Sequence, residues 1–480
     1  MPVNEPGKRQ RTVFERHAPA DSVVEHALAG SSSEPFWLAD IELDDYPSLD
    51  GTHDADLAVV GGGYTGLWTA LLAKQRHPQW RVVLLEARTL GWAASGRNGG
   101  FCEASLTHGE ENGANRFPAE IERLNQLGLD NLDAIEAQVA KLKLDCDFER
   151  TGSMALAVEP YQVEYLQDGP GPDQVYFDQP AIRAEINSPT YLAGLWSKRE
   201  AAMVHPAKLA RALGRAASAA GVEIFEHSKV TGLHTDDRGT RLAVQHGSGS
   251  IRAKKVALGT NVFPSLLKRN ALMTVPVYDY VLMTEPLNRE QLASIGWQRR
   301  QGLSDLANQF HYYRLSADNR ILFGGYDAIY HYGRRVNPEY ENRPASYRKL
   351  ASHFFTTFPQ LEGLRFSHRW AGAIDTCTRF CAFYGTARGG KISYAAGFTG
   401  LGVAATHFAA EVMLDQLEGL DTERTRLTMV RSRPLPFPPE PLASIGIQAT
   451  RAALNQADHR EGKRNLLLKS LDAVGLGFDS

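Results

Sequence analysis

The sequence is poor in cysteine, in long apolar runs and in net charge. Four cysteines in 480 residues are too few for a disulfide scaffold and predict a reducing, cytoplasmic setting. Lys and Arg total 52 against 55 Asp and Glu, and this near balance argues against a protein that holds a nucleic-acid backbone by charge. No segment resembles a secretory signal or a membrane span of about 20 apolar residues. We therefore expect a soluble protein of several domains.

A glycine-rich turn follows the first strongly apolar segment. Residues 56–60 are typical of a buried parallel strand, and Gly61, Gly63 and Gly66 then fit the pattern G-x-G-x-x-G. These glycines permit a tight turn, a close approach to a pyrophosphate and close packing of helix on strand. The next strand ends at Glu86, twenty residues after Gly66, where a carboxylate can bind a ribose. This context favours a dinucleotide-binding β-α-β unit over a turn used only for packing.

A second loop of small residues comes directly after this unit, at 91–100. Small side chains suit a backbone that passes close to an extended cofactor. Arg97 and Asn98 offer donors for a diphosphate or for the edge of a flavin. A simple nicotinamide enzyme does not need such a loop, so the segment favours FAD over NAD.

Glycines recur near the C-terminus, at Gly397, Gly400 and Gly402, where a predicted strand runs into a predicted helix. The amides of 400–403 are then unobstructed at a helix start, which favours negative charge. Reduction of a flavin builds such charge on its pyrimidine ring, so this loop could stabilise the reduced state. A strand-to-helix turn used only for packing is the alternative.

With the stretch Ala-Ser-Gly-Arg-Asn-Gly-Gly at 94–100, the chain resembles the FAD-dependent superfamily of D-amino-acid, glycine and sarcosine oxidases. It is most similar to the γ-glutamylputrescine oxidase-like branch. Segments at 222–261, 276–286 and 395–403 extend the resemblance, which covers about 54–420. The resemblance implies an α/β fold (α+β overall) with a discontinuous Rossmann-like FAD-binding domain and a mixed-sheet substrate domain.

The expected domains alternate along the chain. The FAD-binding domain comprises 51–105, 200–265 and 365–425, and the substrate domain comprises 106–199 and 266–364. Outside the resemblance lie a loop-like N-terminal arm (1–50) and a C-terminal tail (426–480), which contains an amphipathic helix pattern and could serve self-association into a homo-oligomer.

The resemblance and the glycine patterns together imply non-covalent FAD. The residues expected to bind it are Gly61, Gly63, Tyr64, Thr65, Gly66, Glu86, Ala87, Arg88, Ser95, Gly96, Arg97, Asn98, Gly99, Gly100, Val230, Gly259, Gly397, Thr399, Gly400, Leu401, Gly402 and Val403.

The family resemblance implies oxidation of the C–N bond of a primary or secondary amine by hydride transfer to the flavin. The imine then hydrolyses, and oxygen or another acceptor removes the electrons. Glycine oxidases place an arginine after a Trp-Ala-Gly segment, but here 370–372 is followed by Ala373 and Ile374. The lysines of sarcosine oxidases fall at 403–404 and 322–323, where this chain has none. We therefore expect an amine larger than a small α-amino acid.

Aromatic and basic residues on the predicted substrate-domain strands are candidates for the pocket wall. Strand alternation places His311 and Tyr313 on one face and Tyr312 and Arg314 on the other. Packing within the sheet is the alternative role for each tyrosine. The expected catalytic residues are Tyr278, Tyr280, His311, Tyr313 and Arg369, with Arg314 and Tyr326 as further wall candidates.

Two other functions are alternatives to amine oxidation. An NAD(P)H-dependent flavin hydroxylase should show a Gly-Asp pair in the C-terminal strand, whereas 395–398 reads Ala-Ala-Gly-Phe. A flavin-binding module without turnover is supported only by the tail. Cys377 and Cys381 lack further ligands at zinc spacing, so we expect two ordinary buried cysteines and no metal.

Overall fold

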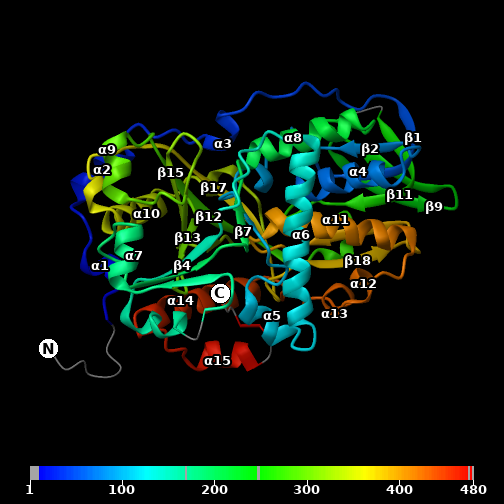
Figure 1. Cartoon of the computed structure of the whole chain (residues 1–480). Coiled ribbons are helices and arrows are strands. Elements are labelled where there is room, and N and C mark those ends of the chain that lie inside the picture. Colours follow the sequence, from blue (N-terminus) through cyan, green and yellow to red (C-terminus); the bar gives the residue numbers. More distant parts are fainter. Residues whose placement is uncertain (1–9, 168–169, 246–248, 474–475, 478–480) are drawn as a thin grey trace.

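The computed structural model describes residues 10–167, 170–245, 249–473 and 476–477. The chain forms two large sheets that lie side by side, each covered by its own helices (Figure 1). Segments from distant parts of the sequence alternate between the two sheets. The expected α/β class is confirmed.

The first sheet, on the right in Figure 1, contains the predicted β-α-β unit. Its order is β18-β19-β11-β1-β2-β8, with β10 and β9 added beyond β11. Every residue of β2 is buried, as expected for a parallel strand covered on both faces. The strands are β1 (Thr52–Val60), β2 (Val82–Leu85), β8 (Glu223–Phe225), β9 (Val230–Asp236), β10 (Gly239–Val244), β11 (Ser250–Leu258), β18 (Phe383–Ala387) and β19 (Ile392–Ala396).

Helices α4 (Tyr64–Arg76), α8 (Pro206–Ala219) and α11 (Gly402–Glu418) pack together against this sheet. Helix α4 follows β1 and α11 follows β19, and these strands flank β11 as parallel neighbours. Because carboxyl ends of parallel strands share one edge, both helices begin at the same edge of the sheet. Two glycine-rich turns separated by more than 300 residues are thereby brought together.

The second sheet has the order β16-β12-β15-β14-β13-β4-β6-β5, with β17 paired to β12. Helix α10 (Pro344–Thr357) covers one face and encloses an aromatic-rich core. The strands are β4 (Ser153–Ala157), β5 (Gln174–Phe177), β6 (Ala193–Ser197), β12 (Thr274–Thr284), β13 (Gly302–Asp305), β14 (His311–Leu315), β15 (Ile321–Gly325), β16 (Ile329–Tyr330) and β17 (Phe366–Cys377).

The remaining elements surround these sheets. A short ribbon pairs β3 (Phe101–Glu103) with β7 (Ala201–Met203). Within the described residues, no helix is long and apolar enough to cross a membrane. The other helices are α1 (Val13–Arg16), α2 (Asp21–Leu28), α3 (Phe36–Ala39), α5 (Glu110–Arg116), α6 (Ile121–Leu142), α7 (Gln179–Glu185), α9 (Arg289–Ile295), α12 (Glu423–Arg426), α13 (Thr428–Arg431), α14 (Leu442–Asp458) and α15 (Leu466–Ala473).

The structure differs from the sequence expectations in two segments. The arm expected to be loop-like forms α1, α2 and α3, and Trp37 in α3 is 1% exposed because it packs in a cluster with β12, β15 and β17. The segment from 365, assigned to the FAD-binding domain, begins with β17, which pairs with β12 in the second sheet. Only after β17 does the chain return to the first sheet.

Candidate functional site

A continuous cavity of about 1670 Å³ lies between the two sheets. Its wall includes the carboxyl ends of β1 and β2, the loop 91–99, the turn 398–403, one face of β12, and residues 372–376 of β17. This volume exceeds the roughly 300–1,000 Å³ of ordinary ligand pockets. The cavity therefore has room for a large cofactor together with a second molecule.

The first glycine turn forms one end of this cavity. Gly61 has φ +109°, and a Cβ there would lie 2.4 Å from the carbonyl oxygen of Gly259. A Cβ at Gly66 would lie 1.9 Å from the carbonyl oxygen of Gly61, so only glycine lets α4 pack on β1. Gly63 and Thr65 line the cavity at the start of α4, where first-turn amides have no acceptor within the helix. This turn is built to receive an anion.

Glu86 ties the end of β2 to this turn. Its Oε2 accepts a hydrogen bond from the Gly62 amide at 2.6 Å, and its Oε1 accepts bonds from the Arg88 amide and Trp92 Nε1, both at 2.8 Å. The Arg88 guanidinium lies 4.2 Å from the centre of the Trp92 ring. The carboxylate thus fixes the residues that border the cavity at the carboxyl end of β2.

The loop 91–100 is held by its own side chains. Ser95 Oγ accepts a hydrogen bond from the Tyr64 amide at 3.0 Å, which joins the loop to α4. Asn98 Nδ2 donates to the Ala94 carbonyl at 3.0 Å. Arg97 donates to Glu341 Oε2 at 2.6 Å, which joins the loop to the second-sheet half. The side chains that we expected to donate to a cofactor therefore also hold the loop in place.

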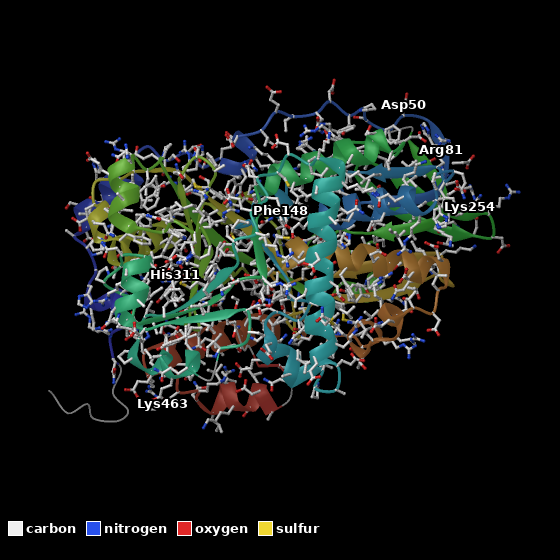
Figure 2. All side chains as sticks on the ribbon, in the orientation of Figure 1. Asp50, Arg81, Phe148, Lys254, His311 and Lys463 are labelled. Atoms are coloured by element: carbon white, nitrogen blue, oxygen red, sulfur yellow. The ribbon has the colours of Figure 1, made fainter. Side chains whose placement is uncertain are left out.

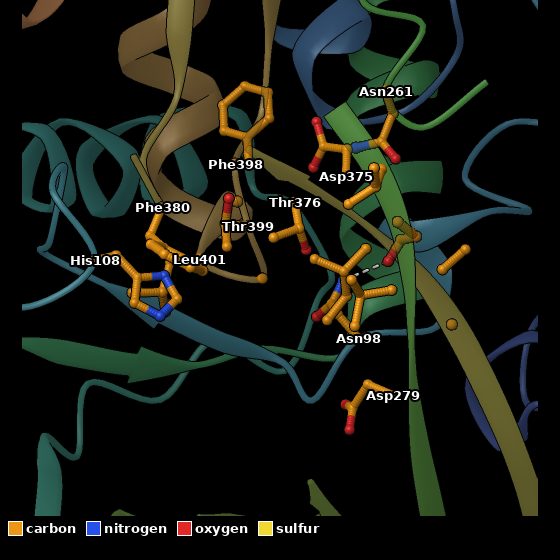
Figure 3. Close-up of a pocket in the computed structure, with 18 of the residues that line it drawn as sticks. Asn98, His108, Asn261, Asp279, Asp375, Thr376, Phe380, Phe398, Thr399 and Leu401 are labelled. Carbon is orange, nitrogen blue, oxygen red and sulfur yellow. Dashed lines mark hydrogen bonds between the residues drawn. The ribbon is translucent and has the colours of Figure 1, made fainter. Parts of the chain in front are cut away.

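The second glycine turn lies opposite, between β19 and α11. Gly397, Thr399 and Gly400 all have positive φ, and Thr399 Oγ1 donates to the Gly397 carbonyl at 3.0 Å. Asp375 in β17 accepts a hydrogen bond from the Gly397 amide at 2.6 Å. Burial raises the pKa of Asp375 to about 6. The turn is thus braced from the second sheet, and its wall residues lie close to those of β17 in Figure 3.

Most residues predicted to bind the cofactor line this one cavity. Gly66, Gly96, Gly100 and Gly397 do not line it; a Cβ at each of them would lie 1.9–2.8 Å from the nearest atom, so these glycines permit close packing. Those that line it are Gly61, Gly63, Tyr64, Thr65, Glu86, Ala87, Arg88, Ser95, Arg97, Asn98, Gly99, Val230, Gly259, Thr399, Gly400, Leu401, Gly402 and Val403.

Residues 56–416 match the FAD-dependent oxidoreductase (DAO) family. The chain belongs to this family. It is 31% identical over 395 residues to gamma-glutamylputrescine oxidoreductase of Escherichia coli, which covers 79% of this chain and 87% of that protein. It is 22% identical over 338 residues to sarcosine oxidase subunit beta of Rhodobacter capsulatus, covering 67% of this chain and 74% of that protein.

Solved structures of this fold agree. Glycine oxidase from Geobacillus kaustophilus superimposes with a TM-score of 0.64 at 19% identity, covering 79% of this chain and 99% of that one. L-proline dehydrogenase from P. horikoshii superimposes with a TM-score of 0.62 at 17% identity, covering 80% and 96%. As a member of the DAO family, the chain is an enzyme that uses FAD.

The cavity has the features that this cofactor needs. Two helix starts bring amides to its wall, and close backbone contacts at glycine keep side chains out of the turn. Asn261, which follows β11, also lines the cavity, and its buried Oδ1 atom has no hydrogen-bond partner among the described residues (Figure 3). A buried acceptor without a donor is costly, which points to a ligand donor at this position. The donor set therefore fits FAD.

The tyrosines expected in the pocket wall lie on the opposite face of the second sheet. Tyr278 Oη donates to the Asn337 carbonyl at 3.2 Å, and Tyr280 Oη donates to the Tyr340 carbonyl at 2.7 Å. Tyr313 shares a hydrogen bond of 2.8 Å between hydroxyls with a buried tyrosine on the loop before β6. None of these three side chains lines the cavity; they belong to the core beneath α10.

Three further predicted contacts, His311, Arg314 and Arg369, also do not line the cavity. His311 is 0% exposed, with Nδ1 2.6 Å from Asp305 Oδ2 and Nε2 2.8 Å from His353 Nδ1 (Figure 2). The Arg369 guanidinium lies over a tyrosine ring of α10, and Arg314 donates to the backbone behind the loop 91–100. Of the wall candidates, Tyr326 lines the cavity.

The cavity face of the sheet instead presents the alternate residues, among them Asp279 of β12 and Tyr312 of β14. The Tyr312 hydroxyl donates to Asp279 Oδ2. A Cβ at Gly99 or Gly324 would lie 2.6 Å or 2.7 Å from the Tyr312 ring, so these two glycines make room for the ring beside the loop 91–100. Burial raises the pKa of Asp279 to about 6 despite the hydrogen bond from Tyr312. The wall between the cofactor loops and the second sheet thus contains a carboxyl group whose charge changes around pH 6.

Cys377 and Cys381 are both buried, and neither lines the cavity. Cys377 Sγ donates to the Cys381 carbonyl at 3.2 Å. Across the described part of the chain, no cluster of three or more His, Cys, Asp or Glu side chains could hold a metal ion. The tail also belongs to the site, which its sequence did not indicate: α14 and α15 contribute apolar residues to the cavity wall.

Proposed function

We propose that this chain oxidises the C–N bond of a primary or secondary amine to an imine, which then hydrolyses to a carbonyl compound. When bound, FAD supplies the two-electron acceptor for this step. The names of similar proteins, gamma-glutamylputrescine oxidoreductase, sarcosine oxidase subunit beta and glycine oxidase, support amines and amino acids as the substrate class. The observation that carries the proposal is the Asp279–Tyr312 pair in the cavity wall.

The cofactor contacts follow from the two turns. We assign the first-turn amides of α4, with Gly61, Gly63 and Ser95, to the diphosphate, because a helix start favours negative charge. We assign Glu86, which lines the cavity at the end of β2, to the ribose. The amides at the start of α11 are assigned to the electron-rich end of the reduced ring system. Since both cysteines of β17 and its following turn lie outside the cavity, we assign the FAD as non-covalent.

The substrate contacts are assigned to the cavity face of the second sheet. A carboxylate at Asp279 attracts a protonated amine and can accept one proton from its nitrogen, so that the neutral amine can lose hydride from the adjoining carbon. The hydrogen bond from Tyr312 orients that carboxylate. Val277 and Val281 flank Asp279 on the same face of β12 and keep water away from the reacting carbon. None of the five residues predicted from the sequence is needed for these tasks.

Anaerobic reduction of the purified FAD-loaded enzyme tests the proposal. Amines are added to the enzyme and the flavin absorbance is followed; bleaching by an amine, with a carbonyl product, is the expected result. Rapid bleaching by NADPH but by none of the amines would favour a flavin hydroxylase. Failure of every amine and of NADPH would refute both amine oxidation and flavin hydroxylation. Readmitting oxygen, and then a quinone, identifies the acceptor.

A further inference from the structure

Helix α14 lies along the second sheet and closes the cavity there, although it follows the segment that matches the family (Figure 1). Gln448 Nε2 donates to the Tyr330 carbonyl at 3.1 Å. Near the C-terminal end of the helix, Asn455 Nδ2 donates to Gln309 Oε1 at 2.7 Å. These bonds fix which face of α14 is turned to the sheet.

Arg451 lies on this same face. It follows Gln448 by three positions and precedes Asn455 by four, and residues so spaced are neighbours on one side of a helix. Arg451 lines the cavity, and so do Ile447 and Leu454, one helical turn before and after it. Arg451 is half-buried and has apolar neighbours in this part of the wall, where screening by water is reduced.

Arg451 forms no ion pair and no hydrogen bond through its side chain with any described residue. Other arginines of the cavity are engaged: Arg97 pairs with Glu341 at 2.6 Å, and Arg88 stacks on Trp92 at 4.2 Å. The cavity-lining segments 372–376 and 399–403 carry no cation. The second-sheet side of the cavity thus includes an arginine that no described residue pairs.

We propose that Arg451 binds a carboxylate of the substrate, so that the tail selects amines that also carry an anionic group. The inference rests on the proposed amine oxidation. An amine held at Asp279 and a carboxylate held at Arg451 would occupy contacts from different elements of the wall, β12 and α14. A guanidinium suits this role because it offers paired donors that match both carboxylate oxygens.

The test uses ω-amino acids of three to six carbons and the alkylamines of matching length. Anaerobic bleaching of FAD-loaded wild type, Arg451→Gln and Arg451→Lys is measured against amine concentration. For the amino acids, we expect Arg451→Gln to raise the half-saturating concentration about 10- to 100-fold with the limiting rate unchanged within about twofold. Arg451→Lys should recover part of the loss. The alkylamines should be unaffected within about twofold.

The control is Arg238→Gln, which removes an exposed guanidinium from the β9–β10 turn. An equal effect of Arg451→Gln on both amine classes, or no preference of the wild type for amino acids, would overturn the proposal. If no amine bleaches the flavin, amine oxidation fails, and calorimetry with glutarate decides the role of Arg451. Glutarate binding that is lost in Arg451→Gln supports the site; equal binding, or none to wild type, overturns it.

Discussion

Replacing Asp279 by Asn tests the electrostatics of the proposed substrate site. Burial raises the pKa of this carboxyl from 3.8 to about 6. A shift of about two pH units corresponds to about 3 kcal/mol of unfavourable free energy for the charged form. Asparagine keeps the size of the side chain and can still accept the hydrogen bond from Tyr312. The substitution therefore removes the charge with little change in packing.

The sign of the effect on stability follows from the direction of the shift. The pKa of Asp279 is higher in the folded state than in the unfolded state. The contribution of this carboxyl to the free energy of unfolding is therefore fully present below about pH 4 and is lost as pH rises through about 6. Asp279→Asn lacks this loss. The free energy of unfolding is measured in urea with excess FAD for the variant and for wild type. The variant value minus the wild-type value should be about 1–3 kcal/mol larger at pH 8 than at pH 4.

Activity should move in the opposite direction. The carboxylate that attracts the amine forms as pH rises through about 6, so kcat/KM of the wild type should rise there. In Asp279→Asn this limb should be absent, and kcat/KM at pH 8 should fall about 10- to 100-fold. Asp237→Asn, an exposed carboxylate in the β9–β10 turn, is the control. An acid limb that persists unchanged in Asp279→Asn would refute the assignment.

Three further substitutions probe the cofactor site. Gly66→Ala puts a Cβ 1.9 Å from a backbone oxygen of the same turn and should abolish retention of FAD on gel filtration. The control is Gly232→Ala, whose Cβ would lie 3.6 Å from its nearest atom, and this variant should retain FAD. Asp375→Ala removes the carboxylate that accepts a hydrogen bond of 2.6 Å from the Gly397 amide. This variant should bind FAD at least tenfold more weakly, as measured by fluorescence titration. Trp37→Phe removes the hydrogen bond of 2.9 Å from Nε1 to the Asn98 carbonyl and should lower the free energy of unfolding by about 1 kcal/mol without loss of FAD; unchanged stability would contradict that role.

The parts of the site that sequence could predict are those fixed over a short stretch of chain. The first glycine turn is specified by residues 56–66, because strand burial, tight turn and helix start all depend on neighbouring residues. Glu86 follows at a spacing that one helix and one strand determine. The second turn, at 397–402, was recognisable in the same way, and the parallel order of β1, β11 and β19 explains why the two turns meet.

Segments whose structure depends on distant partners were harder to predict. The arm reads as a loop because its helices are short, and they are stabilised by contacts such as those of α2 with α10. Helix α14 has an amphipathic pattern, but nothing in that pattern says that its partners are the loop at 308–309 and β16. The assignment of β17 likewise required its pairing with β12, which lies about 90 residues earlier in sequence.

The choice of strand face explains why the predicted catalytic residues differ from those in the cavity wall. Alternation correctly separated His311 and Tyr313 from Tyr312, but it cannot say which set faces a ligand when both faces of a sheet are covered. Here α10 covers one face and needs large aromatic side chains to fill its core, so the aromatic-rich set is structural. The ligand face needs free volume, and it is marked by small and polar residues such as Gly99, Gly324 and Asp279. In this sheet, the glycines that make room for the ring of Tyr312 therefore mark the ligand face. The tyrosines of the core beneath α10 do not mark it.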